Sequence, residues 1–86
     1  MAEVTYGRLD EVLRSLGFSV AVVSAGLLQV KTRLYTHAPT GALVFLPDRP
    51  LTDPAIPHHL LAVRTTLDNY GIAGPMEFAT TLQNGA

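Results

Sequence analysis

The spacing of hydrophobic residues changes along the chain, and each spacing predicts a different element. Over Tyr6–Leu16 apolar residues recur three and four positions apart, which is the period of an α-helix with one buried face. Thr5 is a suitable N-cap for this helix, and Gly17 can adopt the left-handed conformation that ends many helices. The next stretch, Phe18–Val23, alternates and is rich in β-branched residues, so we expect a strand there.

A β-hairpin over Leu27–Pro47 is the central prediction. Its arms are Leu27–His37 and Ala42–Leu46, and Gly41 lies in the turn between them. Side chains of the first arm alternate between two rows. One row is mostly apolar, and the other gathers cationic, aromatic and imidazole side chains: Lys31, Arg33, Tyr35 and His37. We expect this second row to face solvent and ligand binding to occur on it or beside it.

The remaining sequence predicts a loop and two helices. Four prolines over residues 47–57 exclude a strand or a helix interior and favour a stiff crossover. A helix over Pro57–Tyr70 follows, with Gly71 as its C-cap, and a short helix over Met76–Leu82. The predicted fold is α+β, with α-β-β-β-α order in two layers. A three-stranded antiparallel meander carries both main helices on one face, and a short C-terminal helix is added.

The length predicts one domain, residues 1–86, with a core over about 6–72 and the C-terminal helix over about 75–83. The arm Ala42–Leu46 is apolar on both faces and would lie at an edge of the sheet. An edge strand without a charged residue invites pairing with another chain. We therefore expect Leu43, Phe45 and, on the C-terminal helix, Phe78 at a protein interface.

Composition narrows the classes of function. Six Lys and Arg against seven Asp and Glu give a formal net charge of -1, which excludes the broad basic surface of most nucleic-acid-binding domains. A local RNA site stays open, with Lys31 and Arg33 on phosphate and Tyr35 stacked on a base; the alternative is an ordinary solvated strand face. The chain has no cysteine, which excludes disulfides and thiolate chemistry. We expect a cytoplasmic protein without cofactor, metal or membrane segment.

Histidines are the candidate catalytic groups. His37 could act as a general base on a ribose hydroxyl, because imidazole titrates near neutral pH, or it could be a polar residue at the hairpin end. His58 and His59 are adjacent at a helix start, where neighbouring side chains point about 100° apart. This spacing does not favour a metal pair.

Several short motifs, in this order, resemble those of the HicA toxin family, also called YcfA-like proteins. They are Leu16-Gly17-Phe18, Leu34-Tyr35-Thr36-His37, a turn with Gly41, Val44-Phe45-Leu46-Pro47, Val63-Arg64-Thr65-Thr66-Leu67 and Gly71-Ile72. The resemblance implies a fold like that of a double-stranded-RNA-binding domain, cleavage of messenger RNA, and an antitoxin partner. It also implies a catalytic histidine in a Gly-Ser-His type motif near the start of the second strand. That position falls here on Thr32 or Arg33, so both motif and histidine are missing.

We therefore expect a non-catalytic HicA-like domain that acts by association. Its partner would be a second copy in a homodimer, an antitoxin-like protein or, more weakly, RNA. The enzymatic alternative is a divergent ribonuclease toxin of a type II toxin–antitoxin pair, with His37 as base and Lys31 or Arg33 on the phosphate. A third alternative is a binding module without any RNA contact.

Overall fold

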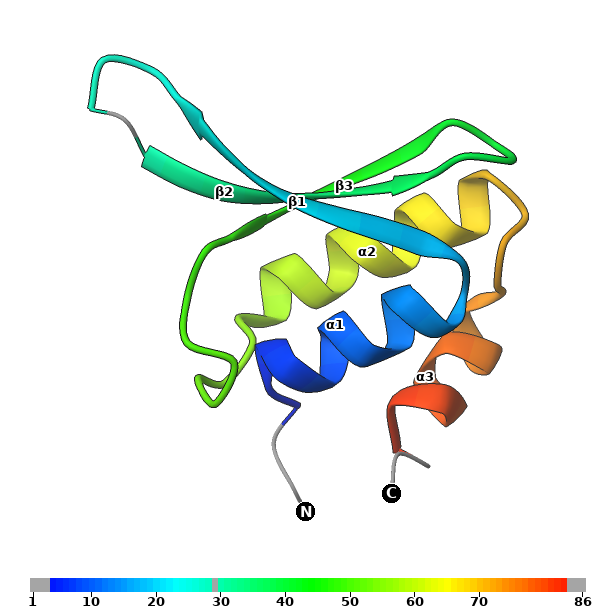
Figure 1. Cartoon of the computed structure of the whole chain (residues 1–86). Coiled ribbons are helices and arrows are strands. Elements are labelled where there is room, and N and C mark those ends of the chain that lie inside the picture. Colours follow the sequence, from blue (N-terminus) through cyan, green and yellow to red (C-terminus); the bar gives the residue numbers. More distant parts are fainter. Residues whose placement is uncertain (1–3, 29, 84–86) are drawn as a thin grey trace.

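The computed structural model describes residues 4–28 and 30–83, and its elements follow the predicted order (Figure 1). They are α1 (Tyr6–Ser15), β1 (Phe18–Ala25), β2 (Val30–His37), β3 (Ala42–Pro47), α2 (Pro57–Asn69) and α3 (Pro75–Gln83). The predicted α+β fold is confirmed, and α3 follows the α-β-β-β-α core.

Capping residues and glycines set the ends of the elements. Thr5 has an extended backbone, and its Oγ1 accepts a hydrogen bond from the Arg8 amide at 3.1 Å, which satisfies one amide of the first turn of α1. Gly17 after α1 and Gly41 in the β2–β3 turn have φ of 99° and 77°, where a side chain would be strained. The predicted N-cap Thr5 and the predicted left-handed Gly17 are therefore confirmed, and Gly41 lies in the turn where it was expected.

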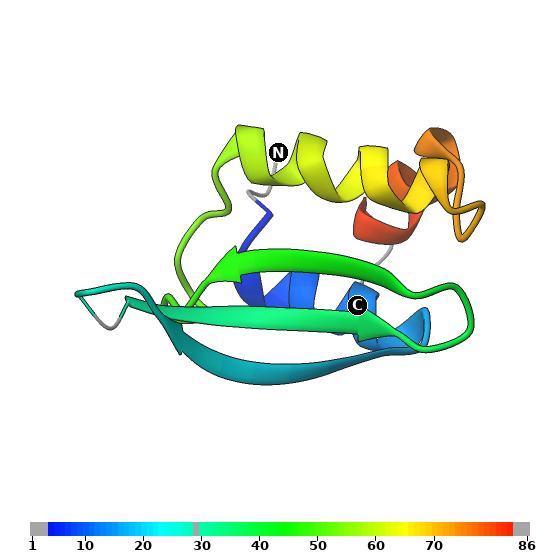
Figure 2. The ribbon, with the colours of Figure 1, turned by 90° about the horizontal axis from the view of Figure 1, so that it is seen from above.

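The three strands form an antiparallel meander in the order β1-β2-β3, so β1 and β3 lie at its two edges. Tyr35 at the centre of β2 lies opposite Val20 on β1 and Val44 on β3. Helices α1 and α2 cover one face of this sheet, here called the inner face, and the other is the outer face (Figure 1). Figure 2 shows that α2 follows the β3 side of the sheet, whereas no described element lies beyond β1.

The end of the β1–β2 hairpin projects past the helices (Figure 1). We call this end, residues 22–28 and 30–31, the arm. Four of its apolar residues are exposed: Val22 by 53%, Leu27 by 101%, Leu28 by 85% and Val30 by 56%. The helix layer is shorter than the sheet, and the arm therefore has no layer beneath it.

The proline-rich loop between β3 and α2 returns to the start of α1. The Asp53 carbonyl accepts a hydrogen bond from the Tyr6 amide at 3.0 Å, and the Leu51 carbonyl accepts one from the Gly7 amide at 2.8 Å. A Cβ on Gly7 would lie 2.8 Å from the Leu51 oxygen, so the close approach requires glycine. The loop thus supplies acceptors for the first turn of α1 as well as crossing between layers.

Candidate functional site

The polar row of β2 faces the helices, so its predicted direction towards solvent is wrong. Tyr35 is only 1% exposed and belongs to the hydrophobic core. Arg33, two residues away in the same row, keeps 19% of its side chain exposed. The ring of Tyr35 is therefore unavailable for stacking on a base, and the expected RNA-binding set is not one accessible face.

A buried carboxylate explains why this row is turned inward. The Tyr35 hydroxyl donates a hydrogen bond to Asp10 Oδ1 on α1 at 2.7 Å, and Arg14 Nε lies 3.0 Å from Asp10 Oδ2. Arg33 approaches Asp10 Oδ1 at 3.8 Å and Asp48 Oδ1 at 3.2 Å. Burial, together with the hydrogen bond to Asp10, raises the pKa of Tyr35 to about 12. The network joins α1 to the centre of the sheet. It also engages the Arg33 guanidinium with two carboxylates.

Lys31 lies in the same row but on the arm, where it is exposed. Six residues of strand separate it from His37, which corresponds to about 20 Å at about 3.3 Å per residue. Arg33 is four residues, or about 13 Å, from His37 by the same measure. Lys31 is therefore too distant to hold the phosphate beside a ribose hydroxyl that His37 would deprotonate, and the Arg33 guanidinium is engaged by Asp10 and Asp48.

His37 lies at the end of the hairpin. Its Nδ1 is 2.8 Å from Thr40 Oγ1 in the turn, and its ring centre is 5.0 Å from that of Phe18. These contacts fit the reading of His37 as a polar residue that braces the hairpin end.

The two positions at which the HicA resemblance would place a catalytic histidine hold no general base. Thr32 lies on the outer face, where it is partly buried, and Arg33 is held by two carboxylates. A guanidinium stays protonated at all ordinary pH values and cannot accept a proton, and a threonine hydroxyl is too weak a base to take one.

The three expected interface residues are in different environments. Leu43 and Phe45 lie on the outer face of β3, where they are 47% and 60% exposed. Phe78 is 3% exposed and packs in the core, so placing it at a partner interface is corrected. Phe78 is the apolar anchor by which α3 is attached to the rest of the domain.

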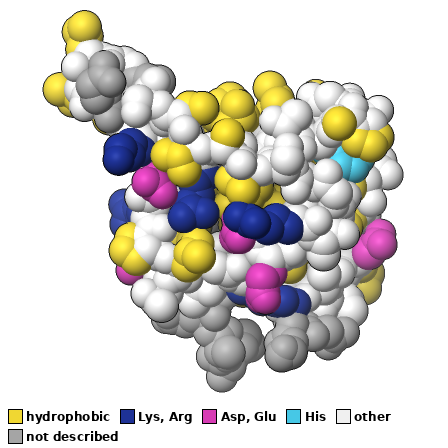
Figure 3. Space-filling view, in the orientation of Figure 1, with side chains coloured by type: hydrophobic (Ala, Val, Ile, Leu, Met, Phe, Trp, Pro, Cys, Tyr) yellow, Lys and Arg dark blue, Asp and Glu magenta, His cyan; other side chains and the backbone are white. Residues whose placement is uncertain are grey.

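The outer face of the sheet carries no charged side chain at nine adjoining positions. Three cross-strand rows make up this surface: Ser19, Thr36 and Leu43; Ala21, Leu34 and Phe45; Val23, Thr32 and Pro47. In Figure 3 the upper rim of the molecule is hydrophobic or uncharged, and Lys, Arg, Asp and Glu lie below it. Sequence reasoning missed this surface because it assigned the charged row of β2 to the wrong face.

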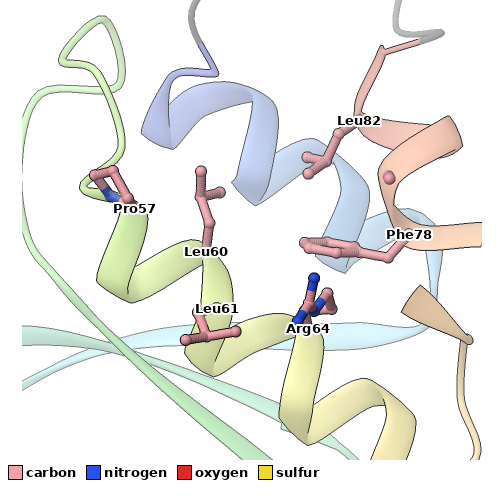
Figure 4. Close-up of a pocket in the computed structure, with 7 residues that line it drawn as sticks. Pro57, Leu60, Leu61, Arg64, Phe78 and Leu82 are labelled. Carbon is pink, nitrogen blue, oxygen red and sulfur yellow. The ribbon is translucent and has the colours of Figure 1, made fainter. Parts of the chain in front are cut away.

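A second apolar feature is the open groove between α2 and α3, with a volume of about 270 Å³. Its lining residues, drawn in Figure 4, are Pro57, Leu60, Leu61, Arg64, Phe78, Ala79 and Leu82. Arg64 is the one charged member of this lining. The groove is large enough for a single apolar side chain and shows no polar cluster suited to catalysis.

His59 has a structural partner. Its Nδ1 is 2.8 Å from the Tyr6 hydroxyl, which also accepts a hydrogen bond from the Ile56 amide at 3.3 Å. Within residues 4–28 and 30–83, no three His, Cys, Asp or Glu side chains are grouped so as to hold a metal ion. In the same part of the chain, no helix has both the length and the apolar character needed to cross a membrane.

No protein-family model, curated protein or solved structure matches the chain. The sheet offers one uncharged region, the outer face, and an arm whose exposed apolar side chains lie beside Lys31; the cations are dispersed.

Proposed function

We propose that the chain is a divergent, non-catalytic HicA-like domain that binds protein through the outer face of its sheet. The observation that carries the proposal is the absence of charge from the nine outer-face positions, with Leu43 and Phe45 exposed at its β3 side. The α-β-β-β-α order is that of HicA-like domains, and it supports the family part of the proposal.

The outer face differs from an ordinary solvated sheet surface. An antiparallel sheet with one face in water usually alternates apolar residues inside with polar residues outside. Here the outward residues are aliphatic, aromatic, proline or hydroxyl side chains. Depletion of charge and exposure of aromatic residues characterise the centres of protein interfaces. Protein is therefore the ligand class that this surface fits best.

RNA is a weaker fit because half of the cations are engaged inside the domain. Arg8 donates hydrogen bonds to the Thr81 and Leu82 carbonyls at the end of α3. Arg14 and Arg33 are paired with Asp10. Lys31, Arg49 and Arg64 lie on three separate elements, so they do not form the continuous basic stripe that tracks a phosphate backbone.

Site-specific photo-crosslinking in cells of the source organism tests the proposal. A photoreactive phenylalanine analogue is placed at Phe45, and the matched control carries it at Met76, which is 82% exposed on α3. We expect protein adducts at position 45 and few or none at position 76. Predominant RNA adducts at position 45, or equal protein adducts at both positions, would contradict the proposal.

A further inference from the structure

The two edges of the sheet differ in how accessible they are. On β3 the inward residues Ala42, Val44 and Leu46 are buried, and α2 follows that side of the sheet (Figure 2). On β1 exposed residues lie on both faces, Ser19 and Ala21 on the outer face and Val22 and Ser24 on the inner face. The open edge is therefore β1, although the sequence draws attention to β3.

The β1 edge lacks the usual protection against pairing. It runs for eight residues, Phe18–Ala25, without a charge, a proline or a glycine. Natural edge strands are commonly short, charged or interrupted, because free amides and carbonyls pair readily with another strand. A strand of this kind is suited to accept a partner strand.

We propose that β1 pairs antiparallel with β1 of a second copy, which joins two sheets into one of six strands. This inference goes beyond the proposed function, because it names an edge of the sheet instead of its outer face, and a specific partner. A second copy is favoured over a strand from a different protein for two reasons. Its β1 edge can pair with the β1 edge of the first copy, and its arm can pack against the first copy at the same time.

The register follows from the two faces of β1. Antiparallel pairing must place inward residues opposite inward residues, since a shift by one exchanges the faces. Pairing Ala21 with Ala21 of the second copy meets this condition and uses residues 18–24 completely. Val20 then lies opposite Val22 of the other copy, and Ser19 lies opposite Val23. Placing the two-fold axis of the dimer at Val22 instead of Ala21 also keeps inward residues opposite inward residues. It leaves Phe18 without a partner within the strand.

This register covers surface that the single chain leaves exposed. Val20 packs beside the core, so Val22 of the other copy, 53% exposed in the monomer, gains an apolar neighbour. The arm of each copy then extends past Phe18 of the other copy, towards the C-terminal end of its α1. Leu27 and Leu28, the most exposed apolar residues of the arm, are directed to that flank.

The arm also bears on the area that a stable dimer needs. Standard interfaces bury about 800 Å² of surface per partner, which is roughly a seventh of the solvent-accessible surface of this chain, 5485 Å². One paired strand is too narrow to supply this area, and the two arms, packed reciprocally, add to it. The charge on each copy, -1, opposes association only weakly.

Cysteine cross-linking tests the register, because the natural chain has no cysteine. Opposed residues in antiparallel strands have Cβ atoms about 4.5–5.5 Å apart, close to the span of a disulfide. We expect Ala21→Cys to form a disulfide-linked dimer under mild oxidation. Val23→Cys and Ser19→Cys should each fail alone, since identical positions would be about 13 Å apart, but should link when mixed. Leu43→Cys, exposed on the other edge, is the matched control and should not link.

Sedimentation equilibrium through the micromolar range supplies the second measurement. The wild-type chain should dimerise, and Ala21→Lys, which opposes two like charges on the two-fold axis, should raise the dissociation constant at least tenfold. Leu43→Lys should leave it unchanged. A monomeric wild type, equal cross-linking at positions 21 and 43, or a dimer weakened by Leu43→Lys instead would overturn the inference. Protein adducts at position 45 combined with any of these results would leave the proposed function standing.

Discussion

The two faces of the sheet divide charge and hydrophobicity in an unusual way. The inner face carries Arg33 beside the core and Lys31 farther out on the arm, and the nine outer-face positions carry no charge. Arg33 is tolerated inside because Asp10 and Asp48 lie within reach of its guanidinium. A row of charged residues on a strand therefore marks the solvent face only when no carboxylate on the layer that covers the sheet can pair with it.

The strongest test of this comparison removes one aromatic ring from each face. Tyr35→Ala should lower the free energy of unfolding by about 3–5 kcal/mol, because it empties a core position and removes the donor to Asp10. Phe45→Ala should cost less than about 1 kcal/mol, because its ring is 60% exposed. Urea unfolding at one low protein concentration measures both. If the alanine variant does not fold, Tyr35→Leu takes its place in the measurement, because it keeps most of the apolar volume. Equal costs on the two faces would contradict the assignment.

High pH offers a milder way to weaken the inner face. The pKa of folded Tyr35, about 12, lies above the value of about 10 for an unfolded tyrosine. The neutral phenol is the form that donates to Asp10, so its stabilisation is complete below pH 10 and is lost as pH rises to 12. Tyr35→Phe should lower stability by about 1 kcal/mol at neutral pH and flatten the decline above pH 10.

The matched control for this pH series is Tyr70→Phe, because Tyr70 is 49% exposed at the end of α2. Urea unfolding across the alkaline range should give the same slope for this variant as for the wild type. A slope in Tyr35→Phe as steep as that of the wild type would show that Tyr35 does not cause the decline.

The smallest expected effects separate two cations within one row. Arg33→Gln should cost about 1 kcal/mol, since it removes the partner of Asp48 and one partner of Asp10. Lys31→Gln should change stability by less than about 0.5 kcal/mol, because Lys31 lies on the arm beyond the helices. Thermal or urea unfolding measures the stability of both variants. A larger loss of stability for Lys31→Gln than for Arg33→Gln would mean that the arm is packed.

Sequence patterns predicted the elements better than the directions of their side chains. Thr5, Gly17 and Gly41 act through local geometry, which a sequence displays directly. The direction of β2 is not local. Both of its rows contain a large apolar residue, Leu34 or Tyr35, and alternation alone cannot rank them.

One contact between residues distant in sequence decides the direction of β2. Tyr35 reaches Asp10, which is 25 residues away in sequence, and this bond fixes the inward row. Once the direction is known, the uncharged outer face can be found by inspecting alternate positions of the three strands. Phe78 was assigned to an interface because a short helix shows an apolar side without showing whether the domain or a partner covers it.

The loop between β3 and α2 has a consequence for how the chain can vary in length. Its Leu51 and Asp53 carbonyls are the acceptors for the first amides of α1, and Gly7 leaves no space for a shift. Insertions or deletions there would remove a helix cap as well as alter a connection. The tip at residues 26–28 makes no such hydrogen bonds to α1, so the fold of a single chain would tolerate an inserted sequence, or the new ends of a circularly permuted chain, at the tip, whereas the proposed dimer would lose the contacts of its arms.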